Sequence, residues 1–241
     1  MTPLSVIITR AHPGAEDTAK AVAALGFKSV LSPMLTLQRD TGIKLPAPER
    51  LAGLVFTSAN GVRFYADAEQ SRALPAWCVG PATAEAARLN GFESVHESAG
   101  DSVALAHFIA ANTKPEARPL LHVANAAATG ELKQTLDTLG FKTEFAPLYH
   151  ALPVTSLPDE TVDALAPGKR AILLIHSRKG ADAFMAAAKD VSLTSVCAAV
   201  ISARAAAPLK AADMDKVEIS EAPNEDGLIA ALKHLAATLS A

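Results

Sequence analysis

Small polar residues cluster where an apolar run ends near residue 57. The stretch Phe56-Thr57-Ser58-Ala59-Asn60-Gly61-Val62 follows a short apolar segment that is typical of a buried strand. In an α/β sheet, the carboxyl end of such a strand opens a crevice and the next helix begins there. Two interpretations stay open. Ser58 or Asn60 caps the helix, or the backbone N–H groups across Ser58, Ala59 and Asn60 bind a carboxylate or phosphate.

A second helix start of this kind is predicted at residues 79–84. The stretch reads Val79-Gly80-Pro81-Ala82-Thr83-Ala84. Gly80 lets a ligand approach the backbone, and Pro81 suits the first turn of a helix, with Ala82 next to it. Thr83 is then either a ligand contact at the mouth of the crevice or a solvated residue of the first turn.

Cations lie at comparable positions elsewhere in the chain. Arg10 ends the first predicted strand, and His176-Ser177-Arg178-Lys179-Gly180 ends a later one. Arg10, Ser177 and Arg178 can converge on one anion, or the arginines can simply solvate a helix end. Because the helix dipole disfavours a cation at a helix start by about 0.3–1 kcal/mol, Arg178 at this place favours a binding role.

Tyr149 is one of two tyrosines and lies beside His150 in a segment flanked by prolines. A tyrosine there can act as an acid or as a hydrogen-bond donor. Equally, its ring can be an amphipathic plug that packs between domains.

Several classes of site are excluded by what the sequence lacks. No G-x-G-x-x-G follows a strand, neither G-x-x-x-x-G-K-[ST] nor G-x-S-x-G is present, and the histidines and cysteines show no metal-ligand spacing. The net charge is −3 with acidic and basic residues intermixed, unlike a nucleic-acid-binding protein. No apolar run reaches the roughly 20 residues of a membrane span. We therefore expect a cytoplasmic protein that uses no cofactor, metal, nucleic acid or membrane.

Positioning these residues requires the alternating strands and helices that the apolar pattern predicts. Short strands separated by helices are typical of parallel sheets with helices on both faces. The ten predicted strands are 4–9, 28–31, 53–57, 76–79, 94–96, 119–123, 142–146, 170–175, 196–200 and 216–219.

An internal repeat predicts that these strands form two related halves. Gly26-Phe27-Lys28 recurs as Gly140-Phe141-Lys142, each after a strand, loop and helix. Two five-stranded sheets then suit the chain better than one. Residues 34–40 and 147–153 lie outside these units and are interpreted as a linker. The first domain would comprise residues 1–37 and 153–241, and the second residues 41–147.

The motifs also occur in a specific order along the chain. They run from Ile8-Thr9-Arg10 through the 56–60 and 79–84 stretches, with Gly91-Phe92, to Tyr149. Together they resemble the uroporphyrinogen-III synthase family over essentially the whole chain. The resemblance implies an α/β fold of two domains, each with a five-stranded parallel sheet flanked by helices, joined by a two-stranded linker. It also implies a monomer that binds hydroxymethylbilane, a linear tetrapyrrole rich in carboxylates, without a cofactor.

In the reaction that the resemblance implies, the terminal hydroxyl leaves as water and the resulting cation is attacked at the substituted carbon of the last pyrrole. A spiro intermediate then rearranges to invert ring D and gives uroporphyrinogen III, in haem biosynthesis, so the enzyme is a cyclising hydro-lyase. Tyr149 matches the family's tyrosine, whose implied role is proton donor. The residues implied in binding the substrate are Arg10, Ser58, Ala59, Asn60, Gly80, Pro81, Ala82, Thr83, Ser177 and Arg178.

The chain departs from the family pattern at residues 201–205. Many relatives have a second Gly-Pro-Thr-Thr-like turn there, whereas this chain reads Ile201-Ser202-Ala203-Arg204-Ala205. Arg204 is the candidate replacement for the threonine in carboxylate binding. The departure also motivates an alternative function, that of a non-catalytic bilobal relative that binds tetrapyrroles. For an enzyme, the pathway position implies a transient handover of substrate from the preceding enzyme.

Overall fold

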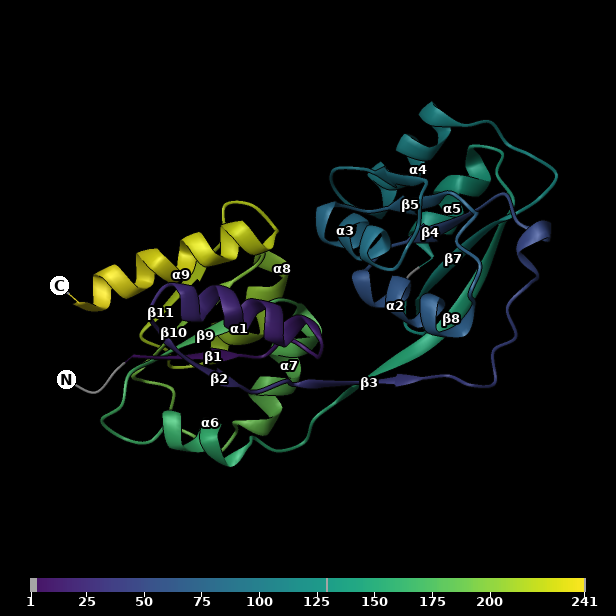
Figure 1. Cartoon of the computed structure of the whole chain (residues 1–241). Coiled ribbons are helices and arrows are strands. Elements are labelled where there is room, and N and C mark those ends of the chain that lie inside the picture. Colours follow the sequence, from purple (N-terminus) through teal and green to yellow (C-terminus); the bar gives the residue numbers. More distant parts are fainter. Residues whose placement is uncertain (1–3, 129, 241) are drawn as a thin grey trace. The chain divides into compact units, whose positions relative to one another are not determined.

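The chain forms two compact units in a computed structural model that describes residues 4–128 and 130–240. Unit 1 consists of the described parts of residues 1–37 and 151–241, and unit 2 of the described parts of residues 38–150. Each unit has its own sheet with helices on both faces (Figure 1). The α/β class with parallel sheets, predicted from the sequence, is confirmed.

Unit 1 is built on a parallel sheet. Its elements are β1 (Ser5–Ile8), α1 (Gly14–Ala24), β2 (Lys28–Leu31), α6 (Asp159–Ala164), β9 (Ala171–Ile175), α7 (Arg178–Ala187), β10 (Val196–Val200), α8 (Ala203–Ala206), the 3-10 helix η2 (Ala207–Ala211), β11 (Lys216–Ile219) and α9 (Glu225–Ser240). The five strands lie in the order β11-β10-β9-β1-β2. Helices α1 and α9 pack on one face, and α6, α7 and α8 on the other.

Unit 2 is built on a sheet of six strands. Its elements are β3 (Leu35–Arg39), which begins in unit 1, the 3-10 helix η1 (Pro48–Arg50), β4 (Gly53–Phe56), α2 (Ala59–Ala68), β5 (Ala76–Cys78), α3 (Pro81–Leu89), β6 (Val95–Glu97), α4 (Ser102–Asn112), β7 (Leu120–Asn125), α5 (Glu131–Thr138) and β8 (Thr143–Pro153), which ends in unit 1. The strand order is β3-β8-β7-β4-β5-β6. Helices α2 and α3 pack on one face, and α4 and α5 on the other.

Each sheet has one point at which the chain reverses its direction of winding. In unit 1 this switch point lies between β1 and β9, and in unit 2 it lies between β4 and β7. Ligands of open α/β sheets bind beside such a point, at the carboxyl ends of the strands. The residues that follow these four strands are therefore the best placed to contact a ligand.

The prediction of two five-stranded sheets is wrong for the second sheet, which has six strands. The sixth is β3, which arises from the segment interpreted as linker, and β8 continues to Pro153 instead of ending near residue 146. Extended backbone needs hydrogen-bond partners, and the two segments supply them to each other. Asp40 N–H donates to Leu148 O at 2.8 Å, and Val154 N–H donates to Met34 O at 2.9 Å. The two expected linker segments are thus a strand pair at the edge of this sheet.

The internal repeat corresponds to a shared helix ending. Gly26 after α1 and Gly140 after α5 have φ values of +82° and +86°, in the left-handed region that glycine adopts most easily. In both turns the following phenylalanine N–H reaches back five residues, from Phe27 to Val22 O at 3.4 Å and from Phe141 to Leu136 O at 2.9 Å. The recurring Gly-Phe therefore directs the chain from a helix into the next strand in each unit.

Candidate functional site

Ser58 caps helix α2 at the carboxyl end of β4. Its backbone is extended, with φ of −161°, and its Oγ accepts a hydrogen bond from Gly61 N–H at 3.1 Å. The capping interpretation of Ser58 is therefore confirmed. Asn60, in the first turn, uses its Oδ1 to accept a hydrogen bond from Arg63 at 3.1 Å. Binding of an anion by the N–H groups of this turn stays a prediction.

Tyr149 lies next to Ser58 although the two residues are far apart in the sequence. The phenolic oxygen of Tyr149 is 3.0 Å from Ser58 Oγ, within hydrogen-bond distance. The Tyr149 ring stacks on Phe64 of α2, with ring centroids 4.7 Å apart and planes 13° from parallel. Only 5% of Tyr149 is exposed. Tyr149 is thus packed by its ring and hydrogen-bonded by its hydroxyl within unit 2, and its role as an acid stays a prediction.

A β-bulge gives Tyr149 this orientation. The register of β7 and β8 pairs Ala124 with Pro147 and then Asn125 with Tyr149, so Leu148 is the extra residue. Side chains of a regular strand alternate between faces, and a bulge changes that alternation. Leu148 and Tyr149 are consequently both buried, at 1% and 5% exposure. The bulge turns Tyr149 toward α2 and the Ser58 cap.

The surroundings keep Tyr149 protonated. Burial raises the pKa of the Tyr149 phenol, and the hydrogen bond with Ser58 opposes that rise without cancelling it. A phenol of this kind carries its proton at neutral pH, so a proton is present to donate, although burial makes the group a weaker acid than an exposed tyrosine. This arrangement favours an acid over a nucleophile.

His122 is a neighbour of this site that the sequence did not single out. It lies on β7 across the switch point from β4, and its Nε2 is 3.1 Å from Thr57 Oγ1. Burial lowers the pKa of His122 to about 4, so the imidazole is neutral at physiological pH. Together with Lys133 and Phe145 it also lines a cavity of about 130 Å³. A lone histidine in an apolar strand gives no sequence signal for such a contact.

The predicted helix start at Gly80 is present and begins α3. Gly80 is the residue before the helix and Pro81 is its first residue. Thr83 is 5% exposed, so its interpretation as a solvated first-turn residue is wrong. Its N–H donates to Gly80 O at 3.1 Å, whereas Pro81 and Ala82 are exposed.

Unit 1 repeats the serine cap. Ser177 follows β9 and has φ of −162°, and its Oγ accepts a hydrogen bond from Gly180 N–H at 3.1 Å. Arg178, the next residue, is half-exposed and places Nε 3.5 Å from Asp182 Oδ2. Ser58 and Ser177 are therefore equivalent caps at the carboxyl ends of central strands.

Arg10 belongs to a cluster around the carboxylate of Glu225. Arg10 Nη1 lies 3.0 Å from Glu225 Oε2, Thr18 Oγ1 donates to Oε1 at 2.6 Å, and His176 Nε2 is 3.3 Å from Oε2. Burial opposes ionisation of Glu225, but the contacts with His176, Thr18 and Arg10 outweigh it and lower its pKa to about 2. Arg10 and Arg178 thus each contact a different carboxylate of the protein, and the expected convergence on one anion is not what these contacts show.

The turn at residues 201–205 also begins a helix. Ser202 caps α8 by accepting a hydrogen bond from Ala205 N–H at 3.3 Å. Arg204 is exposed in this short helix. The local structure is therefore a third serine cap, although the threonine of the family pattern is missing.

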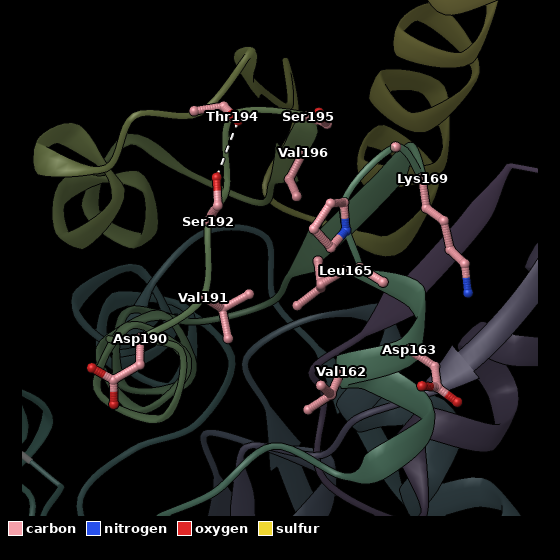
Figure 2. Close-up of a pocket in the computed structure, with 13 residues that line it drawn as sticks. Val162, Asp163, Leu165, Lys169, Asp190, Val191, Ser192, Thr194, Ser195 and Val196 are labelled. Carbon is pink, nitrogen blue, oxygen red and sulfur yellow. Dashed lines mark hydrogen bonds between the residues drawn. The ribbon is translucent and has the colours of Figure 1, made fainter.

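A larger cavity, of about 620 Å³, lies in unit 1 at the amino ends of β9 and β10. In Figure 2 the apolar side chains of Val162, Leu165 and Val191 face its interior, and Asp163 and Asp190 lie on opposite sides. None of the predicted site residues lines it. It lies at the edge of the sheet opposite the strand ends that carry Arg10 and Ser177.

Metal-binding clusters and membrane-spanning helices are both missing from the described residues. Within residues 4–128 and 130–240, no group of three or more His, Cys, Asp or Glu side chains is placed to hold a metal ion. In the same part of the chain, no helix has the length and apolar character needed to cross a membrane.

Comparisons with known proteins agree on one family. The family model described as uroporphyrinogen-III synthase HemD matches residues 16–230. A comparison with curated protein sequences gives no significant match. Among solved structures, uroporphyrinogen-III synthetase from Helicobacter pylori has a TM-score of 0.66 at 16% identity, covering 96% of this chain and 99% of that one.

A second solved structure is similar. A mutant uroporphyrinogen III synthase from the extremely thermophilic bacterium Thermus thermophilus has a TM-score of 0.51 at 17% identity, covering 96% of this chain and 98% of that one. At such identities the structural likeness shows a shared fold. The family-model match extends over most of the sequence, and on that evidence the chain belongs to the uroporphyrinogen-III synthase family.

Proposed function

We propose that this chain cyclises hydroxymethylbilane to uroporphyrinogen III, with inversion of ring D and release of water. Membership of the family supports the reaction. The observation that carries the proposal in this chain is the 3.0 Å contact between Tyr149 OH and Ser58 Oγ. It holds a neutral phenol at the carboxyl edge of the sheet, where ligands of α/β proteins bind.

Tyr149 is the general acid in this proposal. Its O–H proton passes to the terminal hydroxyl of the substrate, the carbon–oxygen bond breaks, and the bonding electron pair leaves with water. A cationic substrate and a tyrosinate remain. The substituted carbon of the last pyrrole attacks the cationic carbon that lost the hydroxyl and forms the spiro intermediate. The bond from that ring carbon to its original bridging carbon then breaks, and the bridging carbon bonds to the other side of the ring, which inverts ring D. The proton released on ring closure restores the phenol, so one substrate gives one product and one water.

Restraint of the substrate is the second requirement. Unassisted closure gives the uninverted isomer, so the protein has to hold the flexible chain in the conformation that leads to inversion. We assign this to groups that bind the substrate's carboxylates at helix starts, where N–H groups are available to anions. In unit 2 these helix starts comprise Ser58, Ala59, Asn60, Gly80, Ala82 and Thr83, with Pro81, which has no N–H, fixing the first turn of α3. In unit 1 they comprise Ser177 and Arg178, with the guanidinium of Arg10 after β1 as a further cation.

We further propose that the two units are two domains, with boundaries near residues 1–37 plus 153–241 and 41–147. The division of the chain into compact units at residues 37/38 and 150/151 supports this.

We also propose a monomer that works in the cytoplasm and receives its substrate in a transient handover. Cys78 and Cys197 are both buried thiols, as in proteins of a reducing compartment. Light scattering during size-exclusion chromatography measures the oligomeric state.

The test is a product analysis. Purified protein receives freshly generated hydroxymethylbilane, the products are oxidised to porphyrins, and the type I and type III isomers are separated by chromatography. Excess type III over a protein-free control is the expected result. Type I alone, from protein with a cooperative unfolding transition, would contradict the proposal.

A further inference from the structure

The hydroxyl of Ser58 has two partners, and their chemistry limits how it is oriented. Gly61 N–H donates to Ser58 Oγ at 3.1 Å, and Tyr149 OH lies 3.0 Å from the same oxygen. A serine hydroxyl has one proton to donate and two lone pairs that accept. The cap occupies one lone pair, so the contact with Tyr149 uses either the serine proton or the second lone pair.

The two directions of this hydrogen bond have opposite consequences for Tyr149. If Tyr149 donates to Ser58, the phenolic proton is held by the protein and is directed away from any ligand. If Ser58 donates to Tyr149, the phenolic proton is available to a ligand. The serine O–H then still donates a hydrogen bond to the phenolic oxygen when that oxygen becomes negative on loss of its proton. Hydrogen bonds to an ionised oxygen are about twice as strong as those between neutral groups.

The ring of Tyr149 is fixed independently of its hydroxyl. Phe64 stacks against it at 4.7 Å between centroids, and the bulge at Leu148 determines the face from which it projects. Ser58 is held by its cap on α2, the helix that also carries Phe64. One helix therefore supplies both the ring contact and the hydroxyl contact of Tyr149.

We propose that Ser58 is a positioning residue for Tyr149, donating its hydroxyl proton to the phenolic oxygen so that the tyrosine proton points toward the leaving hydroxyl of the substrate. This inference rests on the proposed function and deepens it. It replaces binding of a substrate carboxylate as the main role of the Ser58 side chain. In unit 1, Ser177 Oγ accepts the equivalent hydrogen bond from Gly180 N–H, and helix α7 begins at this cap. The serine–glycine hydrogen bond therefore caps a helix start in both units.

A tyrosine titration tests the contact without any activity measurement. The chain has two tyrosines, Tyr65 and Tyr149, so in a Tyr65→Phe background the ultraviolet absorbance of tyrosinate reports Tyr149 alone. In that background Ser58→Gly is expected to move the ionisation midpoint to higher pH, because the tyrosinate loses a donor. Ser58→Thr, which keeps a hydroxyl and a favourable cap, restores the midpoint. Identical midpoints for Ser58→Gly and its parent would overturn the proposal.

Kinetics separate positioning from substrate binding. Ser58→Gly retains a residue that is tolerated before a helix, and its kcat for type III product is expected to fall about tenfold with KM changed less than about twofold. In a Tyr149→Phe background the same change causes no further fall, because the group that Ser58 positions is absent. A rise in KM with kcat unchanged would assign Ser58 to substrate binding. An equal fall of kcat in the wild-type and Tyr149→Phe backgrounds would assign it to folding alone.

The outcomes also separate this inference from the proposed function. If wild-type protein gives no excess of type III isomer, the proposed function fails whatever the titration shows. If wild-type protein is active but neither the Tyr149 midpoint nor the double-variant kinetics responds to Ser58, the positioning role alone fails.

Discussion

Arg10 Nη1 and Glu225 Oε2 lie 3.0 Å apart, although 215 positions separate the two residues in the sequence. Arg10 follows the first strand of unit 1, and Glu225 begins the last helix. Because His176 and Thr18 bind the same carboxylate, Glu225 joins β1, α1, β9 and α9 at the carboxyl edge of the sheet. The guanidinium of Arg10 is thereby held in place by the carboxylate of Glu225, and any substrate carboxylate would have to share it with that partner.

Glu225→Gln should remove a pH-dependent part of the stability of the fold. The pKa of Glu225 is about 2 in the folded protein and 4.5 for an unperturbed glutamate, so its ionised contacts stabilise above about pH 4.5 and are lost as the pH falls through 2. After allowance for its partial exposure, the variant is expected to be about 1–2 kcal/mol less stable at pH 7. Urea unfolding at a series of pH values from 7 to 2 should show that the difference in unfolding free energy between the variant and the wild type becomes smaller.

Glu160→Gln is the matched control for that measurement. Glu160 pairs with Lys28 at 3.4 Å, but more than half of each side chain is exposed, and such pairs contribute little. Its unfolding midpoint should stay close to that of the wild type. If Glu225→Gln lowered the unfolding free energy by the same amount at pH 7 and at pH 2, the ionised carboxylate would not be the cause of the lost stability.

Tyr149→Phe should abolish most of the activity while the fold persists. Loss of a general acid lowers kcat by roughly 10²- to 10⁴-fold, whereas the Phe64 stack of the ring survives the change. Type III formation and thermal unfolding are measured on the same preparation. Tyr65→Phe is the control, since Tyr65 is buried against Phe56 at 5.9 Å between centroids. Wild-type turnover in Tyr149→Phe would exclude Tyr149 as the acid.

His122 should make the stability depend on pH in a different range. Its folded pKa of about 4 lies below the ordinary value of 6.5, so the unfolded chain binds the proton first and stability falls as the pH drops from about 6.5 to 4. The loss amounts to about 3 kcal/mol at most. His122→Gln should remove this slope in urea unfolding, and replacement of the exposed His107 by Gln should leave it intact. A slope unchanged in His122→Gln would refute the assignment.

Gly61→Ala should disturb the Ser58 cap from within α2. A Cβ at residue 61 would lie 2.7 Å from Val123 O of β7, a backbone atom that cannot move aside. Overpacking of this kind costs about 1–3 kcal/mol, and displacement of α2 should lower kcat as well. Gly42→Ala, where the nearest atom is the flexible Asp40 carboxylate at 3.3 Å, should change both quantities little. Equal effects of the two changes would mean that the close approach to β7 is unimportant.

The βα units could be predicted because each combines a short apolar run with a helix and a turn residue, as at Gly26 and Gly140. The two-stranded linker implied by the resemblance made strands in residues 34–40 and 147–153 expected. That β3 belongs to the second sheet could not be predicted, since an alternating pattern fits a free-standing strand pair as well as a sheet edge. Ser58 and Thr83 could be placed at helix starts because such starts carry a local signal. The hydrogen bond between Ser58 and Tyr149 depends on the strand order β4-β7-β8 and on the bulge at Leu148. Neither the strand order nor the bulge leaves a local pattern in the sequence. The pairing of Glu225 with Arg10 leaves none either.

The discontinuity of unit 1 determines the order in which the chain becomes stable during synthesis. Ser5 of β1 pairs with Ala171 of β9, so at about 5–20 residues per second β1 waits on the order of ten seconds or more for that neighbour. Unit 2 is continuous in sequence, so all its strands are synthesised before β9. A nascent chain that stops near residue 154 therefore contains every strand of the second sheet but lacks β9, β10 and β11 of the first, and the apolar strand β1 is still without the neighbour that covers its inner edge.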